Sequence, residues 1–166
     1  MDILVAINEF KGSLSSEELR EIVTKKICEI LPNVNVSSQV IADGGDGFLA
    51  LFKDFTKESF ITVNALGKEI RAEYLINNYR KEAVIEVAEI IGLKHLTDEE
   101  KDPYKTTTAG LGKLIKYLLK QGIKHYIIGL GGSATNDCGI GMLTELGYKF
   151  TDGNAKIRKP WIQSLK

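Results

Sequence analysis

The chain has 166 residues, and its 22 Lys and Arg side chains balance its 22 Asp and Glu side chains, so the formal net charge is zero. A composition that is 43% hydrophobic and 27% charged is normal for a globular protein and excludes a disordered charged tail. Without a basic excess to neutralise phosphates, we expect no nucleic-acid partner. No apolar run approaches the roughly 20 residues that span a bilayer, so no membrane partner is expected either.

The cysteines and the N-terminal residues indicate the cellular compartment in which the protein is expected. Cys28 and Cys138 are too few for a disulfide scaffold and lack the close spacing of a zinc site. The N-terminus has no basic leader before its short apolar stretch. We therefore expect a reducing, cytoplasmic location.

The first third of the chain alternates strands and helices. Ser15 and Glu18 have the spacing of a capping box, and Pro32 ends the helix that follows. This pattern predicts parallel strand–loop–helix units of the Rossmann type. The predicted elements are a strand at 4–7, a helix at 16–31, a strand at 34–41 and a helix at 47–54.

The rest of the chain has a different pattern. Asn77-Asn78 is a tight-turn signal because Asn tolerates the left-handed conformation, which favours antiparallel pairing of the strands on either side. Leucines at helical spacing, followed by Gly122, predict a long amphipathic helix. The predicted elements are strands at 59–64, 70–76, 83–87, 125–130 and from 148, a capping box at 97–100, and helices at 111–119 and 142–146.

The expected fold class is therefore α/β. Residues 1–57 would form the first part of one α/β domain with a parallel sheet, and residues 58–166 a second, partly antiparallel α/β domain or part of one. Because the last strand has barely begun when the chain ends, we expect an incomplete sheet with an unpaired edge.

Three polar loops follow strands and precede helices, a position at which open parallel sheets bind ligands, so we expect them to gather at one sheet edge and line one site. The first, 8–15, contains Lys11 as its one cation. Lys11 is either a solvated surface lysine or a point charge that binds a phosphate or a carboxylate. The second, Asp43-Gly44-Gly45-Asp46-Gly47, brings two acids that could hold Mg²⁺ or accept a proton. The alternative is a turn in which Asp46 caps the next helix.

The third loop, 129–137, combines glycines with small hydroxyl residues and is suited to cradle a phosphate, although it lacks the Lys of a P-loop. Gly129, Gly131 and Ala134 also fit the dinucleotide pattern G-x-G-x-x-A, with Asp152 as the ribose-binding acid. A dinucleotide-binding module is thus an open alternative. Residues 106–108, three threonines, predict a cap for the long helix or hydroxyls that face a ligand.

Together, these segments resemble the bacterial-type glycerate kinase family. The resemblance covers nearly the whole chain in the right order, and its last motif is long and specific. The matching segments are Phe10-Lys11-Gly12-Ser13-Leu14-Ser15-Ser16, Ala42-Asp43-Gly44-Gly45-Asp46-Gly47, Ala83-Val84-Ile85-Glu86-Val87-Ala88, Asp102-Pro103 with Thr106 to Gly110, and Gly129-Leu130-Gly131-Gly132-Ser133-Ala134-Thr135-Asn136-Asp137.

The resemblance implies phosphorylation of a hydroxyl of D-glycerate by ATP with Mg²⁺. Such a reaction requires positioning, charge neutralisation and an oriented hydroxyl. The residues expected to be catalytic are Lys11, Asp43 and Asp137, and Asp43 or Asp137 would orient the hydroxyl or hold the metal. The expected metal ligands are Asp43 and Asp46. The expected substrate- and phosphate-binding residues are Ser13, Gly44, Gly45, Asp46, Gly131, Gly132, Ser133, Thr135 and Asn136.

The chain departs from the family pattern at individual motif positions and in its length. Asn8-Glu9 stands where Asp-Ser is usual, Asp46 where Glu is usual, and Cys138 where Gly is common. Family members are considerably longer. We therefore expect an N-terminal portion with little activity alone, which either needs a second chain for the missing half or self-associates. A non-catalytic subunit or remnant of a split kinase is the further alternative.

Overall fold

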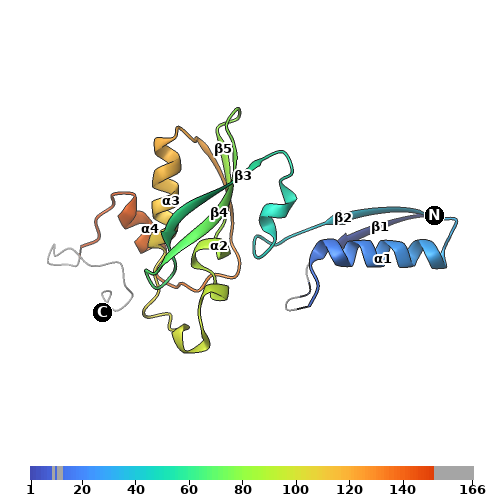
Figure 1. Cartoon of the computed structure of the whole chain (residues 1–166), viewed down its shortest axis with the longest axis horizontal. Coiled ribbons are helices and arrows are strands. Elements are labelled where there is room, and N and C mark those ends of the chain that lie inside the picture. The colour runs from blue at the N-terminus through green and yellow to red at the C-terminus, as the bar shows by residue number, and fades with distance from the viewer. Residues whose placement is uncertain (9, 11–12, 152–166) are drawn as a thin grey trace.

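The computed structural model describes residues 1–8, 10 and 13–151 (Figure 1). Strands β1 (Asp2–Ile7) and β2 (Asn35–Val40) pair in parallel, with Ile3 opposite Val36. Helix α1 (Ser16–Ile30) connects them and packs on one face of the pair. This is the strand–helix–strand unit that the alternation predicted.

The start and end of α1 confirm the capping prediction. The Ser15 hydroxyl accepts a hydrogen bond from the Glu18 amide at 3.3 Å, and the Glu18 carboxylate accepts one from the Ser15 amide at 2.9 Å. The helix ends at Ile30, two residues before Pro32, because Leu31 has already left the helical conformation. The capping box thus satisfies two amides at a helix N-terminus where no backbone acceptor is available.

The segment after β2 differs from its prediction. In place of a helix over 47–54, it contains a single 3-10 turn, η1 (Phe48–Leu51). Gly47 precedes it at φ +83°, in the left-handed region, and provides no side chain to cap it. The rings of Phe48, Phe52 and Phe55 then pack edge to face in sequence, with centroids 5.1 and 5.7 Å apart. Aromatic packing against the neighbouring sheet, and not helical hydrogen bonding, orders this segment.

A second sheet has the strand order β3-β4-β5-β6, with β3 (Thr56–Val63), β4 (Glu69–Asn77), β5 (Glu82–Glu86) and β6 (His125–Gly129). The first three strands are antiparallel, and β6 pairs in parallel with β5. In the β4–β5 turn, the Asn77 side chain accepts the Arg80 amide at 3.0 Å. The left-handed residue of that turn is Lys81, at φ +55°, and not Asn77 or Asn78.

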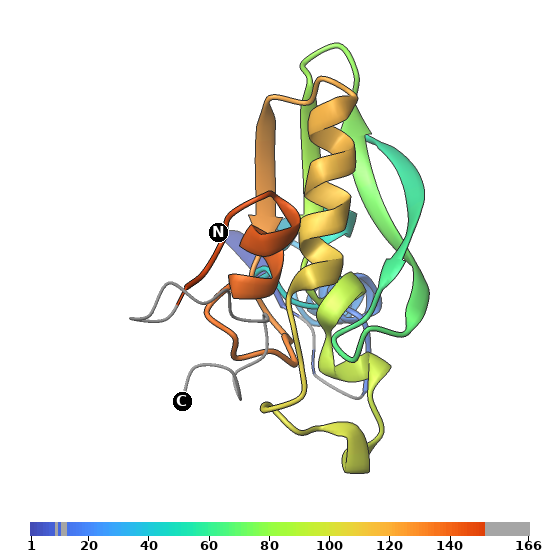
Figure 2. The ribbon, with the colours of Figure 1, turned by 90° about the vertical axis from the view of Figure 1, so that its left-hand side faces the viewer.

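The remaining helices follow β5 or β6 along the chain. They are α2 (Ala88–Ile91), the 3-10 turns η2 (Leu93–His95) and η3 (Asp98–Glu100), α3 (Ala109–Lys120) and α4 (Ile140–Glu145). Figure 2 shows α3 lying along one face of the sheet. The core between them contains alternate residues of β4 and β5 and the apolar stripe of α3, namely Ala72, Tyr74, Ile76, Ala83, Ile85, Leu111, Leu114, Ile115 and Leu118.

The fold is thus α/β, with a small parallel sheet and a mixed sheet of four strands. Of the strand predicted to begin at 148, residues 148–150 have no strand pairing, Thr151 is a bridge residue, and the continuation lies outside the described residues. The predicted division of the chain into domains 1–57 and 58–166 stays a prediction, and β3 begins two residues before it, at Thr56. In the described part of the chain, no helix is long and apolar enough to span a membrane.

Candidate functional site

The second and third polar loops meet backbone to backbone. Loop 42–47 leaves the carboxyl end of β2, and loop 129–137 leaves the carboxyl end of β6, which belongs to the other sheet. A Cβ placed on Gly131 would lie 2.5 Å from the Gly45 Cα, and one on Gly44 would lie 2.8 Å from the Leu130 amide nitrogen. Only residues without side chains allow this approach, so the glycines that suggested a phosphate cradle also join the two loops.

The three loops were predicted to gather at one sheet edge, and the structure instead joins loops from two sheets. In the first loop, Ser13 is exposed and its hydroxyl donates to the Phe10 carbonyl at 3.1 Å. Ser15 and Ser16, at the start of α1, line a cavity of about 330 Å³ together with Gly47 of the second loop. Lys11 lies outside the described residues, as does Asp152.

The two acids of the second loop have different surroundings. Asp43 is exposed, and its Oδ1 accepts the Gly45 amide at 3.0 Å, which closes a tight turn. Asp46 is also exposed but forms an ion pair with Lys94, with its Oδ1 3.1 Å from the ammonium nitrogen. Asp46 therefore does not cap the next helix, and its carboxylate is already engaged by a lysine.

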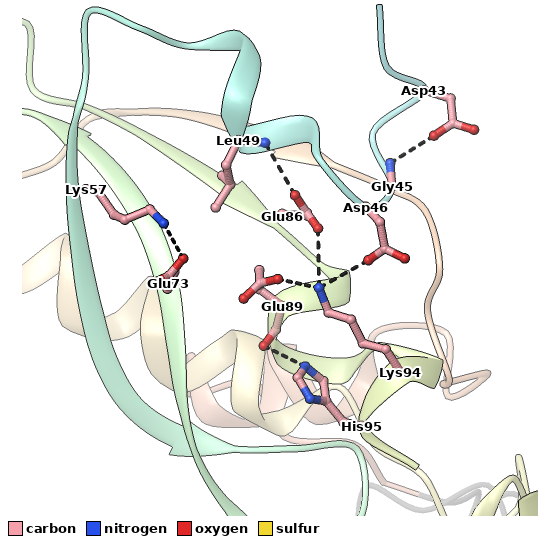
Figure 3. Close-up of polar contacts among 10 residues, drawn as sticks. All are labelled: Asp43, Gly45, Asp46, Leu49, Lys57, Glu73, Glu86, Glu89, Lys94 and His95. Atoms are coloured by element: carbon pink, nitrogen blue, oxygen red, sulfur yellow. Dashed lines mark hydrogen bonds and ion pairs between the residues drawn. The ribbon is translucent and has the colours of Figure 1, made fainter. Parts of the chain in front are cut away.

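Lys94 is the centre of a cluster that the sequence did not indicate (Figure 3). Besides Asp46, its ammonium group forms an ion pair with Glu89 and lies 3.7 Å from the Glu86 Oε1. Glu86 is 2% exposed, and its Oε2 accepts the Leu49 amide of η1 at 3.3 Å. Burial raises the pKa of the Glu86 carboxyl, and the Leu49 amide and Lys94 oppose that shift.

The segment that carries Lys94 also holds the third loop. The Leu93 amide donates to the Gly132 carbonyl at 2.8 Å, and the Ala134 amide donates to the Ile91 carbonyl at 2.8 Å. Lys94 is therefore bonded to loop 42–47 while its neighbour Leu93 is bonded to loop 129–137. Glu86 lies in the segment 83–88, which matches the family pattern, so the sequence could have identified it as a candidate. No motif in the sequence pointed to Lys94.

Asp137 is 1% exposed and serves as an internal acceptor. Its Oδ2 accepts the Thr108 amide at 2.9 Å and hydroxyl at 3.0 Å, the Thr107 hydroxyl at 3.2 Å and the Gly141 amide at 3.1 Å. Its Oδ1 accepts the Gly139 amide at 3.1 Å. The carboxylate thus joins the start of α3 to the start of α4. Of the two aspartates considered for orienting a hydroxyl, Asp43 is the exposed one, and the contacts of Asp137 favour a positioning role.

The remaining predicted residues of the third loop border a second cavity. Ser133, Thr135 and Asn136 line a space of about 220 Å³, opposite Lys101 and Pro103. Gly132, at φ +60°, turns the chain between this cavity and the contact with loop 42–47. The third loop therefore has one side against the second loop and another side open to a small ligand.

The geometry gives the dinucleotide alternative little support. In a Rossmann fingerprint, the glycine loop leads directly into a helix whose N-terminus binds the pyrophosphate. Here, Ala134 is bonded to Ile91, and α4 begins only at Ile140. The helix that the pattern requires is therefore not at the required position.

A magnesium ion would be compatible with the second loop. Among the described residues, no three His, Cys, Asp or Glu side chains come together as a metal cluster. Mg²⁺ does not need one, because it commonly binds one or two carboxylates together with phosphate oxygens and water. Exposed Asp43 fits that requirement, whereas Asp46 would first have to separate from Lys94.

The fold and the paired glycine loops define an α/β chain with a polar site at strand ends, and comparison with known proteins gives its family. The profile of the Glycerate kinase family matches residues 3–166. The chain belongs to the glycerate kinase family.

Individual relatives agree with that assignment. The chain is 36% identical over 163 residues to a glycerate kinase of Bacillus cereus and 38% identical over 158 residues to the glycerate 2-kinase of Escherichia coli. These matches cover 96% and 93% of this chain but 43% and 41% of the relatives. The crystal structure of a Salmonella typhimurium LT2 protein assigned as glycerate kinase 2 matches with a TM-score of 0.76 at 33% identity, over 99% of this chain and 45% of that one. The chain thus spans less than half the length of these relatives, a share consistent with the expected N-terminal portion.

Proposed function

We propose that this chain provides part of the active site of a glycerate kinase, which transfers a phosphoryl group from ATP to a hydroxyl of D-glycerate and yields phosphoglycerate. The observation that carries the proposal is the contact between loops 42–47 and 129–137 in a chain of this family. It places an exposed carboxylate next to a glycine- and hydroxyl-rich loop, which are the groups that phosphoryl transfer needs for positioning.

The residues receive the following proposed roles. Asp43 orients the attacking hydroxyl, and Lys11 binds a phosphate or the carboxylate of glycerate. Backbone groups of Gly44, Gly131 and Gly132 and the side chains of Ser13, Ser133, Thr135 and Asn136 bind the substrates, while Gly45, whose amide is engaged by Asp43, shapes the loop. Asp46 and Asp137 act indirectly, since their carboxylates are engaged by Lys94 and by the starts of α3 and α4.

Mg²⁺ would neutralise charge on the ATP phosphates when it is bound. Asp43 would hold it, with Asp46 as a second carboxylate if its ion pair opened. The cytoplasmic location expected from the sequence stays a prediction.

An ADP-release assay with D-glycerate, ATP and Mg²⁺ tests the proposal. The chain is assayed alone and together with the part of the Escherichia coli relative that this chain does not match; that part alone is the control. We expect turnover only in the mixture, because the chain covers 41% of that relative. Activity of the chain alone would show that the site is complete within 166 residues and contradict the expected incompleteness. A folded mixture without turnover would contradict the proposed function and favour a non-catalytic remnant.

The roles of Asp43 and Lys11 have their own test. In the active mixture, Asp43→Asn and Lys11→Ala are each expected to abolish turnover while the thermal unfolding midpoint stays unchanged. Asp54→Asn is the matched control, since Asp54 is exposed and lies outside both glycine loops. Wild-type turnover in either test variant would remove that residue from the mechanism.

A further inference from the structure

The cavity beside the third loop has a chemical character of its own. Its described lining consists of one cation, three hydroxyl or amide side chains and apolar groups, namely Lys101, Ser133, Thr135, Asn136, Leu93, Pro103 and Ala134. None of these side chains is a carboxylate, so the described lining attracts negative charge. The volume of about 220 Å³ lies below the range of about 300–1,000 Å³ that is typical for drug-sized ligands, so the cavity is suited to a small molecule.

Lys101 is free to turn toward a ligand in this cavity. Its ammonium lies 2.6 Å from the Asp98 Oδ1, in an ion pair across the single turn η3. The Asp98 side chain is 89% exposed, so water screens this pair and a better-desolvated anion can compete for the lysine. The backbone around it is held, because the Lys101 amide donates to the Asp98 carbonyl and the third loop is bonded to Ile91 and Leu93.

We propose that this cavity binds the carboxylate of a small hydroxy acid, and that Lys101 is the cation that anchors it. Ser133, Thr135 and Asn136 supply donors and acceptors for the hydroxyl groups of such a molecule, and Leu93 and Pro103 contact its carbon atoms. The choice of D-glycerate as the ligand rests on the proposed function. A nucleotide phosphate would offer similar charge, but the small volume favours the hydroxy acid.

The test is a titration of the full chain, followed by NMR signals of the backbone amides. Wild-type protein and the variants Lys101→Met, Lys101→Arg and Lys105→Met are titrated with D-glycerate, with glycerol and with inorganic phosphate. Lys105 is the matched control, because it also forms an ion pair with an aspartate three residues earlier, Asp102, but does not line the cavity.

We expect D-glycerate to shift the amides of residues 133–136 in wild-type protein, and Lys101→Met to weaken its binding at least tenfold. Lys101→Arg, which keeps the charge, and Lys105→Met are expected to bind within about threefold of wild type, and glycerol is expected to bind poorly because it lacks the carboxylate. Equal affinity of Lys101→Met and wild type, or no binding by wild type, would overturn the proposal.

Two further outcomes distinguish this proposal from a phosphate site and from the proposed kinase function. Tighter binding of phosphate than of D-glycerate at the same amides, lost in Lys101→Met, would overturn it in favour of a phosphate site. Lysine-dependent binding of D-glycerate combined with a silent ADP-release assay would support the carboxylate site while the proposed kinase function fails.

Discussion

Lys94 interacts with several carboxylates that come from different segments of the chain. Its ammonium is within 4 Å of carboxylates from three segments of the chain, those of Asp46, Glu86 and Glu89. Of these carboxylates, Glu86 has the greatest need of a nearby cation, since it is buried and its Oε1 has no hydrogen-bond donor in the described part of the chain. An ionised carboxylate in such surroundings is costly unless a cation stays nearby.

Removal of Lys94 should therefore cost stability in a pH-dependent manner. Because burial raises the pKa of Glu86 in the folded chain, its contribution to stability is full at low pH and falls as the pH rises through that raised pKa. In Lys94→Met, the pKa of Glu86 rises further. We expect a loss of about 1–2 kcal/mol in the free energy of unfolding at pH 8 and a much smaller loss at pH 4.

Urea denaturation at both pH values measures this effect. Lys105→Met serves as the control, and we expect it to resemble wild type at both pH values, since the Lys105 side chain is 66% exposed. A Lys94→Met chain with the same deficit at pH 4 and pH 8 would show that Lys94 acts through packing and not through its charge.

Asp137 is the residue at which structure and sequence expectation differ most. It was expected to be catalytic, but its two oxygens accept hydrogen bonds from four residues, Thr107, Thr108, Gly139 and Gly141. We expect Asp137→Asn to lower the free energy of unfolding by about 2–4 kcal/mol, because the amide group turns a donor toward donors. Denaturant unfolding checks this, with exposed Asp98→Asn as a control that should be unchanged. An unaltered stability of Asp137→Asn would return Asp137 to the catalytic candidates.

At the scale of the elements, local signals predicted most of what was local. Both capping boxes, the end of α1 before Pro32 and the span of α3 depend on residues within one or two helical turns of each other, so they are visible in the sequence. The predicted helix at 47–54 is wrong, because that segment is ordered by contacts with Glu86 and by its own aromatic rings. The continuation of the strand predicted from 148 lies outside the described residues.

The contact between the two glycine loops is an element-scale feature with a direct test. In Gly131→Ala, the new Cβ would lie 2.5 Å from the Gly45 Cα, so the loops must separate. We expect a loss of about 2–3 kcal/mol in the free energy of unfolding. In Gly47→Ala, the new methyl group meets nothing within 4 Å, and only the strain at φ +83° remains, about 1 kcal/mol.

Chemical denaturation of both variants compares a steric effect with a purely conformational one in the same region. Equal losses for Gly131→Ala and Gly47→Ala would mean that the loops can move apart freely, and it would weaken the argument that their contact shapes the site.

At the scale of the whole molecule, stability is unevenly distributed. The core lies between the four-stranded sheet and α3, whereas Val5 is the one buried hydrophobic side chain among the described residues of the first 40. No residue of α1 is buried, and Leu4 on β1 is 70% exposed. Segments with so few buried apolar contacts open at low free-energy cost.

Hydrogen exchange should reveal this difference. We expect amides of β1, β2 and α1 to exchange about 100-fold faster than those of β4 and β5 in the isolated chain. Adding the C-terminal part of a relative is expected to slow exchange in β1 and in its partner β2, since the exposed Leu4 of β1 would then be covered. Equal protection of both sheets in the isolated chain would contradict the uneven distribution of stability.

The sequence by itself determined the α/β class, nearly all helices and strands, and the family, because these depend on local periodicity and on motifs read along the chain. Only the tertiary structure decided which sheet each glycine loop belongs to, that Lys94 joins three carboxylates and that Asp137 lies inside. These features arise where segments distant in sequence meet, and burial and pairing at such contacts depend on the whole fold and not on neighbouring residues.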